Sequence, residues 1–507
     1  MEKNVLEWLE ATALRYPDKI VYEDMEEGIT FGELRHEALC VGSALADMGL
    51  SDKPVAVMMG RNVHTIAAFL GVVYSGHAYA PIDGSQPEAR IGKILKRLEP
   101  DVLITDGTGE EAGLDLKSLC GSARVTGYDE LKNCSADKDK LDKIRDRMTE
   151  DDPLYVIFTS GSSGVPKGVV TSHHSLMNYI SAYSDMMEIN EDDRLCSQSP
   201  LDYIAAVRDI YVPLLAGAYT CLCPKEYFMQ PMALIGLLNE KKVTCLGWST
   251  SALSVLSKLK AFGEGKPEYL KKVCFSGSVM PSAVIREWQR ELPGTVFVNQ
   301  YGPTETTASC TYYKIDHEVA EGETLSVGKP YRNYKIILLK EDGTAAADGE
   351  YGEICVAGQG LALGYYNDME LTAASFVQNP LNHSYRELIY RTGDIGRINE
   401  DGDLEFHGRK DRQIKHMGHR VELDEIESAA MISEGVSKAA ALYDINKEML
   451  WLFYEGDADK KDVTAILREQ LPGFMVPRKV RQLDEIPKLP NGKTDMESLK
   501  GYMGGTK

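Results

Sequence analysis

The amino-acid sequence predicts an α/β protein. We expect a large N-terminal domain of two layered α/β sheets, a small β-barrel-like subdomain and a small α+β C-terminal domain. The chain has 507 residues, of which 43% are hydrophobic, enough to bury several cores. Strand and helix patterns alternate through its first half, and short hairpin-like strands replace them after Ser326.

Strand-then-helix units recur in the N-terminal part. Residues 54–59 have the pattern of a strand, residues 62–74 carry helical apolar spacing, and residues 78–83 fit the next strand. Residues 101–106 and 243–247 fit the same strand pattern. Strands that alternate with helices of about 10 to 15 residues indicate layers built on mainly parallel sheets.

The region between Ser326 and Phe406 has a different texture. Asp-Gly and Gly-rich turns separate its short β-rich pieces, which are residues 335–339, 352–357 and 402–406. Such spacing is typical of a hairpin-built or barrel-like subdomain.

A charged segment marks the expected domain boundary. After Gly408, residues 409–415 are mostly charged, and a helix (422–433) and a strand (439–443) follow. This order indicates a small α+β domain on a charged hinge. We therefore expect one domain over residues 1–408 and a second over residues 409–507.

The chain carries a strong negative charge. Its formal charge of −21 opposes a general nucleic-acid or anionic-membrane binder, because a phosphate backbone requires a basic surface. Acidic residues stand where a signal peptide would be basic, and no apolar run of about 18 residues occurs. The ten cysteines show no zinc-site spacing. We expect a cytoplasmic protein with no nucleic-acid or membrane partner.

The most informative segment is a loop that follows an apolar strand at residues 155–158. The loop residues are Thr159, Ser160, Gly161, Ser162, Ser163, Gly164 and, after Val165 and Pro166, Lys167. Glycines let backbone N–H groups approach a ligand, hydroxyls can surround phosphate oxygens, and the lysine adds positive charge. The Gly-x4-Gly-Lys-Ser/Thr pattern of a Walker loop is absent. The segment predicts a phosphate-binding loop of another kind.

Further motifs follow the loop in order. They are residues 299–306 (Asn-Gln-Tyr-Gly-Pro-Thr-Glu-Thr), 390–394 (Tyr-Arg-Thr-Gly-Asp), 408–415 with 418–423, and 490–495 (Pro-Asn-Gly-Lys-Thr-Asp). With the loop, they make nearly the whole chain resemble the adenylate-forming superfamily of acyl-CoA synthetases, firefly luciferases and nonribosomal peptide synthetase adenylation domains. Residues 79–83 and 413–415 are similar to the peptide-synthetase and D-alanine–carrier protein ligase types. The resemblance implies that ATP, with Mg²⁺, activates a carboxylic acid as an acyl-adenylate.

The residue types suit this chemistry. Both reactants are anionic, so the site must supply positive charge and oriented donors. The loop from Thr159 to Lys167 can hold the departing phosphates. Glu305, after a Gly-Pro turn, can bind a Mg²⁺ ion that bridges phosphate oxygens. A solvated loop carboxylate is the alternative for Glu305.

We expect the nucleoside of ATP to bind at residues of the motifs at 299–306, 390–394 and 408–415. Tyr301 offers a flat face for adenine, and Asn299 an amide for the base edge. Asp394 can accept two ribose hydroxyls, with Arg409 as a donor near the same sugar. A packed core tyrosine and a turn residue are the structural alternatives for Tyr301 and Asp394. Gly302 and Thr304 complete the expected nucleotide-binding set.

Lys493 stands in a Pro-Asn-Gly turn near the end of the chain. By resemblance, it is the lysine that bridges the carboxylate and the α-phosphate, and a plain surface lysine is the alternative. The resemblance also implies that the C-terminal domain is mobile and rotates about Asp411 between adenylation and thioester formation. In the second state, Gly418 would line the path of the thiol.

The resemblance places the acid pocket by a count back from Leu214-Leu-Ala-Gly-Ala218. Amino-acid-activating relatives carry an aspartate where the count gives Ile204, and Asp202 lies two residues earlier. The other pocket positions are Ala205, Arg208, Gly247, Cys274, Ser276, Gln300, Ala308 and Ser309. We expect a small amino acid or a hydroxy or aryl acid as the substrate.

Arg208 is the guanidinium among these positions. An unpaired buried charge is costly, so Arg208 either meets a substrate carboxylate or phenolate, or pairs with Asp209 or another acid. The sequence leaves both alternatives open.

The acyl acceptor also has alternatives. Nothing after Lys493 resembles a carrier domain, so we expect a stand-alone ligase that loads the phosphopantetheine thiol of a separate carrier protein. Carrier proteins are usually acidic, so a local basic patch, with residues 409–415 as the candidate, would have to overcome the net charge. An acid–CoA ligase that uses free CoA and a non-catalytic nucleotide-binding regulator are the alternatives.

Overall fold

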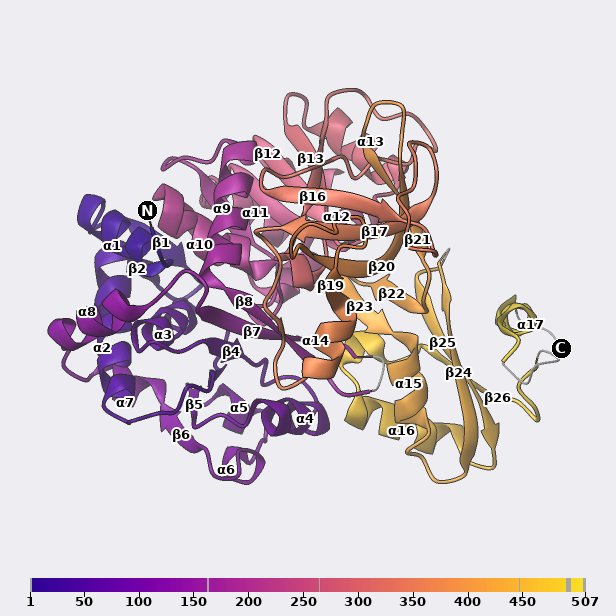
Figure 1. The fold of residues 1–507 in the computed structure, drawn as a ribbon, viewed down its shortest axis with the longest axis horizontal. Helices are drawn as coiled ribbons and strands as arrows, with labels where there is room; N and C mark the ends of the chain where they lie inside the picture. The colour runs from indigo at the N-terminus through magenta and orange to yellow at the C-terminus, as the bar shows by residue number, and fades with distance from the viewer. Residues whose placement is uncertain (1, 162–163, 264, 446, 489–493, 505–507) are drawn as a thin grey trace. The chain divides into compact units, whose positions relative to one another are not determined.

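The computed structural model describes residues 2–161, 164–263, 265–445, 447–488 and 494–504. Their contacts divide the chain into two compact units, drawn in Figure 1. The first unit comprises Met1–Gly84, Leu98–Ile157 and Gly168–Lys410, and the second comprises Ser85–Arg97, Phe158–Lys167 and Asp411–Lys507. The last division falls between Lys410 and Asp411. The domain boundary at residues 408 and 409 stays a prediction.

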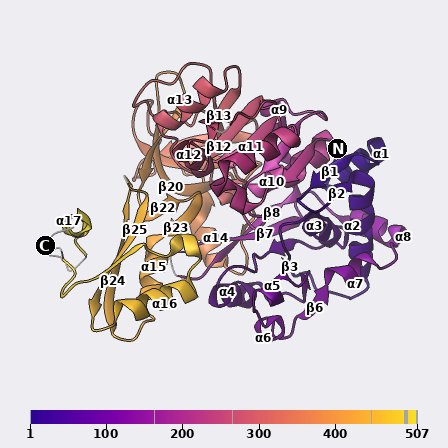
Figure 2. The same cartoon turned by 180° about the vertical axis from the view of Figure 1, so that it is seen from behind.

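The largest sheet lies in the first unit. Its strands are β1 (Ile20–Glu23), β2 (Gly28–Thr30), β9 (Arg194–Ser197), β10 (Tyr219–Leu222), β11 (Cys245–Ser249), β12 (Lys272–Ser276), β13 (Val296–Tyr301), β14 (Thr311–Ile315) and β15 (Lys329–Pro330). Their order is β15-β14-β13-β12-β11-β9-β10-β1-β2, with parallel pairing from β13 to β1 and antiparallel pairing at both edges. Helices α11 (Pro231–Glu240), α12 (Thr250–Lys258) and α13 (Ser282–Glu291) share one apolar core with this sheet (Figure 2).

A second sheet confirms the predicted strand–helix alternation. Its strands are β3 (Val55–Met58), β4 (Tyr79–Pro81), β5 (Val102–Thr105), β6 (Arg124–Gly127), β7 (Pro153–Thr159), β8 (Lys167–Ser172) and β18 (Gly364–Tyr365). Their order is β18-β8-β7-β4-β3-β5-β6. The pairs from β7 to β6 are parallel, and β18 is antiparallel to β8.

Helices join the two sheets into the main core. They are α1 (Leu6–Arg15), α2 (Phe31–Ala46), α3 (Val63–Tyr74), α9 (His173–Met187) and α10 (Ala206–Ala216), whose apolar residues cluster with residues of both sheets. Local sequence fixes where these helices begin. Thr30 and Glu33 form a capping box on α2, and Ser172 caps α9 through the Ser175 N–H. Further helices of this unit are α5 (Thr108–Glu111), α6 (Leu116–Leu119), α7 (Tyr128–Lys132), α8 (Lys138–Arg147) and α14 (Met369–Ser375).

The predicted hairpin-built part is an antiparallel sheet of the first unit. Its strands are β16 (Tyr334–Leu339), β17 (Gly352–Gly358), β19 (Phe376–Gln378), β20 (Leu388–Ile398) and β21 (Leu404–Arg409). Their order is β16-β17-β20-β19, and β21 also pairs with β20. The prediction of a strand from residue 402 was early by two residues. Gly402 has a φ of 77° and forms the turn, so the strand starts at Leu404.

The second unit contains an α+β fold, as the sequence predicts. Its elements are α4 (Glu88–Leu98), the hairpin β22 (Gln413–His416) and β23 (His419–Glu422), α15 (Leu423–Ala430), β24 (Val436–Asp444), β25 (Met449–Gly456), α16 (Lys460–Gln470), β26 (Lys479–Gln482) and α17 (Met496–Gly501). Strands β24, β25 and β26 form a sheet, and α15 and α16 pack on it around Ile426, Leu452 and Leu467.

Candidate functional site

The predicted phosphate loop begins where β7 ends and closes tightly. A β-carbon on Gly161 would meet the carbonyl oxygen of Val165 at 2.2 Å, so glycine is required at position 161. The Gly164 N–H donates to the Gly161 carbonyl at 2.9 Å, and Gly164 has a φ of 74°. The loop is therefore held by its own backbone.

Two hydroxyls of this loop have different surroundings. Ser160 Oγ donates to the carbonyl of Arg420, in the same unit, at 2.8 Å. The Thr159 hydroxyl is buried and has no hydrogen-bond partner among the described residues. Leaving such a group unsatisfied costs about 1–3 kcal/mol, and a phosphate oxygen would satisfy it. Lys167 begins β8 and is buried, whereas Ser162 and Ser163 lie outside the described residues.

Asp394 is the centre of a buried hydrogen-bonded group in the first unit. It lies directly across the β20–β21 pair from Arg409, whose guanidinium donates to Asp394 Oδ1. The Tyr301 hydroxyl donates to Asp394 Oδ2. Burial raises the pKa of Tyr301 well above its usual value, and the Asp394 charge adds to the effect, so Tyr301 is a neutral donor. A carboxylate has about four lone-pair positions and can also accept ribose hydroxyls.

The neighbouring motif residues are also buried. The Asn299 amide donates to the Ser326 carbonyl at 2.8 Å, and Thr304 is buried in the turn that follows β13. A β-carbon on Gly302 would meet Ser309 Cα at 2.5 Å. Glycine at position 302 therefore lets the motif fold back against the next segment.

Glu305 lies on a 3₁₀ turn (Thr304–Thr306) and is fully buried. Its Oε1 accepts a hydrogen bond from the Tyr365 hydroxyl at 2.7 Å. Its backbone carbonyl accepts the Ala362 N–H at 2.9 Å. These contacts fix the orientation of a carboxylate that the sequence identifies only by its motif.

The backbone just after Glu305 is strained. Thr307 has a φ of 55° and Ala308 a φ of 70°, both in the left-handed region. A residue with a β-carbon costs on the order of 1–3 kcal/mol there, and such strain concentrates at functional sites. The two positions follow the predicted metal ligand and include a predicted pocket residue.

The residues predicted for the conformational cycle lie in the second unit. Asp411 is exposed, and its Oδ1 accepts the Gln413 N–H at 3.2 Å. Gly418 has a φ of 84° between β22 and β23. Lys493 lies outside the described residues. The hinge and the bridging lysine therefore stay predictions.

The predicted acid pocket brings the start of α10 to the sheet. Gly247, Cys274 and Gln300 lie on the neighbouring strands β11, β12 and β13, with Gly247 directly across from Cys274. Ile204 and Ala308 are buried, whereas Asp202 and Ser276 are partly buried. A β-carbon on Gly247 would make only ordinary contacts, including one of 3.7 Å to Arg208 Nε.

Arg208 connects four of the pocket positions. Its Nη1 donates to Gln300 Oε1 at 2.7 Å and to Cys274 Sγ at 3.8 Å. Its Nη2 and Nε donate to the Gly247 and Ala205 carbonyls, both at 3.4 Å. Within the part of the chain that the structure describes, no ion pair joins Arg208 to Asp209 or to another acid. The structural pairing that the sequence left open is therefore absent there.

The charged segment 409–415 is not a free basic patch. Arg409 binds Asp394, Lys410 binds Glu353 at 2.8 Å, and Arg412 binds Glu427 at 2.7 Å. These cations are already matched with carboxylates, so they have little charge to offer to a partner.

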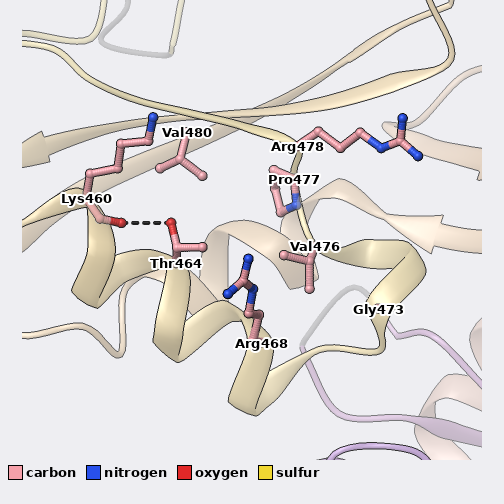
Figure 3. Close-up of a pocket in the computed structure, with 8 residues that line it drawn as sticks. All are labelled: Lys460, Thr464, Arg468, Gly473, Val476, Pro477, Arg478 and Val480. Carbon is pink, nitrogen blue, oxygen red and sulfur yellow. Dashed lines mark hydrogen bonds between the residues drawn. The ribbon is translucent and has the colours of Figure 1, made fainter.

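A different cluster of cations lines a pocket of about 500 Å³ in the second unit. Figure 3 shows Lys460, Thr464 and Arg468 along one side of α16, with Val476, Pro477 and Val480 opposite and the Arg478 side chain extending away from Lys460 and Arg468. Spacings of four residues place the first three on one helix face. Lys460, Arg468 and Arg478 form no ion pair with any described residue, and no acidic side chain lines the pocket. We call these three residues the basic pocket.

The AMP-binding enzyme family matches residues 9–366, and the C-terminal domain of AMP-binding enzymes matches residues 425–493. The chain belongs to the AMP-binding enzyme family. It is an adenylate-forming, AMP-producing ligase of the nonribosomal peptide synthetase adenylation type.

Relatives of this AMP-binding enzyme differ in length. It is 31% identical to zwittermicin A synthase ZmaJ of Bacillus cereus, over 97% of this chain and 93% of that protein. It is 29% identical to tyrocidine synthase 1 of Brevibacillus parabrevis, over 98% of this chain but 45% of that protein. The fold is similar to that of holo-PA1221, a nonribosomal peptide synthetase protein containing adenylation and PCP domains, with a TM-score of 0.83 and 24% identity. The similarity covers 99% of this chain and 84% of that chain. In the described part of the enzyme, no helix is both long and apolar enough to cross a membrane.

Sequence reasoning missed several residues that contact the predicted site residues of this AMP-binding enzyme. Tyr365 orients Glu305, and Tyr331 accepts a hydrogen bond from the Gln300 amide at 3.0 Å. Tyr183 lies beside Arg208, with its ring centre 5.8 Å from the guanidinium carbon. In the sequence they look like ordinary core tyrosines, with no motif spacing that would single them out.

Proposed function

We propose that this enzyme activates a small carboxylic acid with ATP and then transfers the acyl group to the phosphopantetheine thiol of a separate carrier protein. The observation that carries the proposal is the buried group in which Tyr301 and Arg409 hold Asp394. A carboxylate oriented in this way suits two ribose hydroxyls, because it is fixed by donors and still has lone pairs to accept more.

In the first step, a carboxylate oxygen of the acid attacks the α-phosphorus of ATP. The bond to the bridging oxygen on the β side breaks, and pyrophosphate leaves. The loop from Thr159 to Lys167 would hold the leaving group, and Lys493 would bridge the acid and the α-phosphate. The buried, unpartnered Thr159 hydroxyl supports the assignment of the loop.

Mg²⁺ fits the residues of the first unit. Glu305 supplies a buried, oriented carboxylate, and no cluster of three or more His, Cys, Asp and Glu side chains exists among the described residues to form an all-protein cage. This suits Mg²⁺, which is usually held by one or two carboxylates together with substrate phosphates. When bound, the ion would neutralise phosphate charge.

In the second step, the thiol loses its proton and its sulfur attacks the acyl carbon. The bond from that carbon to the adenylate oxygen breaks, and AMP leaves. The PCP domain that PA1221 contains and the similarity to tyrocidine synthase 1 support a carrier protein as the acceptor. The basic pocket supports an acidic partner, since Lys460, Arg468 and Arg478 remain unmatched by any described residue in a chain of net charge −21.

ATP–pyrophosphate exchange over amino, hydroxy, aryl and dicarboxylic acids tests the first step. Thioester formation with a holo carrier protein and with free CoA tests the second. Exchange followed by carrier loading supports the proposal. Turnover of CoA without carrier loading would identify an acid–CoA ligase. No exchange with any acid would favour a nucleotide-binding regulator.

A further inference from the structure

We infer that Arg208 is the receptor for a second carboxylate on the acid substrate, so that the preferred acid is a small dicarboxylic acid, with or without an α-amino group. The inference rests on the proposed function, because it names the substrate class of the same pocket. Three features of the first unit carry it: the burial of Arg208, the lack of a matching anion among the described residues, and the way in which its neighbours hold it.

The guanidinium is buried and charged, yet its described hydrogen-bond partners are all neutral. Arg208 is 1% exposed. Its acceptors are the Gln300 amide, the Gly247 and Ala205 carbonyls and the Cys274 sulfur. An arginine cannot release its proton to escape this setting, and burial of an unmatched charge costs several kcal/mol. A bound anion would remove that cost.

Asp209 is next in sequence but does not supply this anion. Successive residues on a helix point about 100° apart, so Arg208 and Asp209 face different neighbours. Asp209 Oδ2 is buried and has no hydrogen-bond partner among the described residues. Burial raises the pKa of Asp209 to about 7, against the opposing effect of Arg208 and Arg61, so its negative charge is only partly present at neutral pH.

The other cation close by is Arg61, which is half-buried and held by other partners. Its guanidinium donates to the Gln198 and Ser199 carbonyls at 3.1 and 2.8 Å, and to the Ser197 hydroxyl. Of these two cations, Arg208 is the one that contacts the pocket positions on β11, β12 and β13, namely Gly247, Cys274 and Gln300.

The neighbours of Arg208 hold it in a fixed orientation. Gln300 binds Nη1 at 2.7 Å and is itself held by Tyr331. The remaining contacts, at 3.4 and 3.8 Å, are long and weak. A planar guanidinium matches a carboxylate through two parallel hydrogen bonds. A substrate carboxylate would thus replace the weak contacts and keep the strong one.

Exchange kinetics with pairs of acids of equal shape test the inference. We would compare aspartate with asparagine, glutamate with glutamine, and succinate with succinamate. A site that holds a charged group by hydrogen bonds rejects the neutral analogue strongly, so the dicarboxylic member should have a kcat/KM about 100-fold higher or more. Arg208→Gln should remove this preference and leave the KM for ATP unchanged. A measured preference for the neutral member would overturn the inference.

Gln300→Glu is a second variant that keeps the test valid if Arg208→Gln does not fold. The new carboxylate would pair with Arg208 inside the protein, so this variant should lose the dicarboxylic preference and melt at a higher temperature than the wild type. Unchanged preference in Gln300→Glu would contradict the inference. Hydroxybenzoates are tested separately in the same exchange assay. If they exchange best, and do so through Arg208, the second group is a phenolate and the carboxylate assignment is wrong.

The panel also separates this inference from the proposed function. If only acids without a second carboxylate support exchange, the proposed function stands and the dicarboxylic assignment is refuted. If no acid supports exchange, both are contradicted.

Discussion

Asp394 and Arg409 face each other across the β20–β21 pair, and their side chains form a buried ion pair. Three residues along β20, Arg397 and Glu405 also face each other across the same strands and pair at 2.7 Å. The side chains of the second pair are 38% and 28% exposed, against 14% and 7% for Arg409 and Asp394. The two pairs share a backbone setting and differ in burial.

Asp394→Asn should weaken ATP binding. Hydrogen bonds to a charged group contribute about 1.5–3 kcal/mol, so we expect the KM for ATP in the exchange assay to rise about 10- to 100-fold. Arg397→Gln is the matched control on the same strand and should leave this KM unchanged. An equal rise in both variants would show that the effect comes from the strand pair and not from a nucleotide contact.

Tyr365→Phe should leave the Glu305 carboxylate in place but less well oriented. The variant loses one hydrogen bond of 2.7 Å, and we expect exchange to slow about 10-fold and to require more Mg²⁺. Titrating the rate with Mg²⁺ checks this. Tyr366→Phe, at the next position, should behave like the wild type. A slower rate with an unchanged Mg²⁺ requirement would speak against metal binding at Glu305.

Charge reversal in the basic pocket should separate the two thiol acceptors. The triple variant Lys460→Glu, Arg468→Glu and Arg478→Glu should raise the KM for a holo carrier protein about 10-fold or more and leave adenylation unchanged. The control changes Lys3, Lys117 and Lys271 to Glu, which alters the net charge equally at exposed positions elsewhere. Equal effects of both triple variants would mean that only net charge matters.

Asp209 should make folding stability depend on pH. Its pKa is about 7 in the folded protein and about 3.9 when unfolded, so the folded state binds more protons between these values. Its contribution to the free energy of unfolding is full below about pH 4. It falls as pH rises towards 7, by up to about 1.4 kcal/mol per pH unit.

In Asp209→Asn, the free energy of unfolding should not show this decrease as pH rises. Urea unfolding of both proteins between about pH 5 and pH 8 measures the difference. The exposed Asp348→Asn change is the control and should follow the wild type. A constant difference between wild type and Asp209→Asn across this range would contradict the assignment.

Lys493→Ala should abolish adenylation while largely preserving thioester formation from supplied acyl-adenylate. In the proposed cycle, the lysine would bridge the acid and the α-phosphate only in the first step. Single-turnover assays of each half-reaction check this. Equal loss in both halves would refute the proposed role.

Strand–helix periodicity predicted the sheets because buried strands carry continuous apolar runs. Residues 54–59 and 101–106 contain β3 and β5 completely. The strand expected at residues 243–247 lies at Cys245–Ser249 instead. Lys242 has a φ of 50°, so the chain is still turning out of α11 where the apolar run begins. Hydrophobic periodicity does not predict such backbone turns.

Motif spacing gave the residues that we expect at the site, but not how they contact each other. Asp394 and Arg409 are 15 residues apart and meet because a hairpin sets their register. The role of Tyr365 depends on a pairing of β18 with β8 between residues far apart in sequence. For Arg208 and Asp209, helix geometry rather than sequence adjacency decides that they do not pair.

Gly247 has a consequence for how this enzyme can diversify. A β-carbon there would meet only ordinary contacts, at 3.5 Å from the Tyr183 hydroxyl, 3.6 Å from Cys274 Sγ and 3.7 Å from Arg208 Nε. The fold therefore does not reserve this position for glycine. A single alanine could shorten the pocket while Arg208 stays in place, so the length of the acid and its charge can change in separate mutational steps.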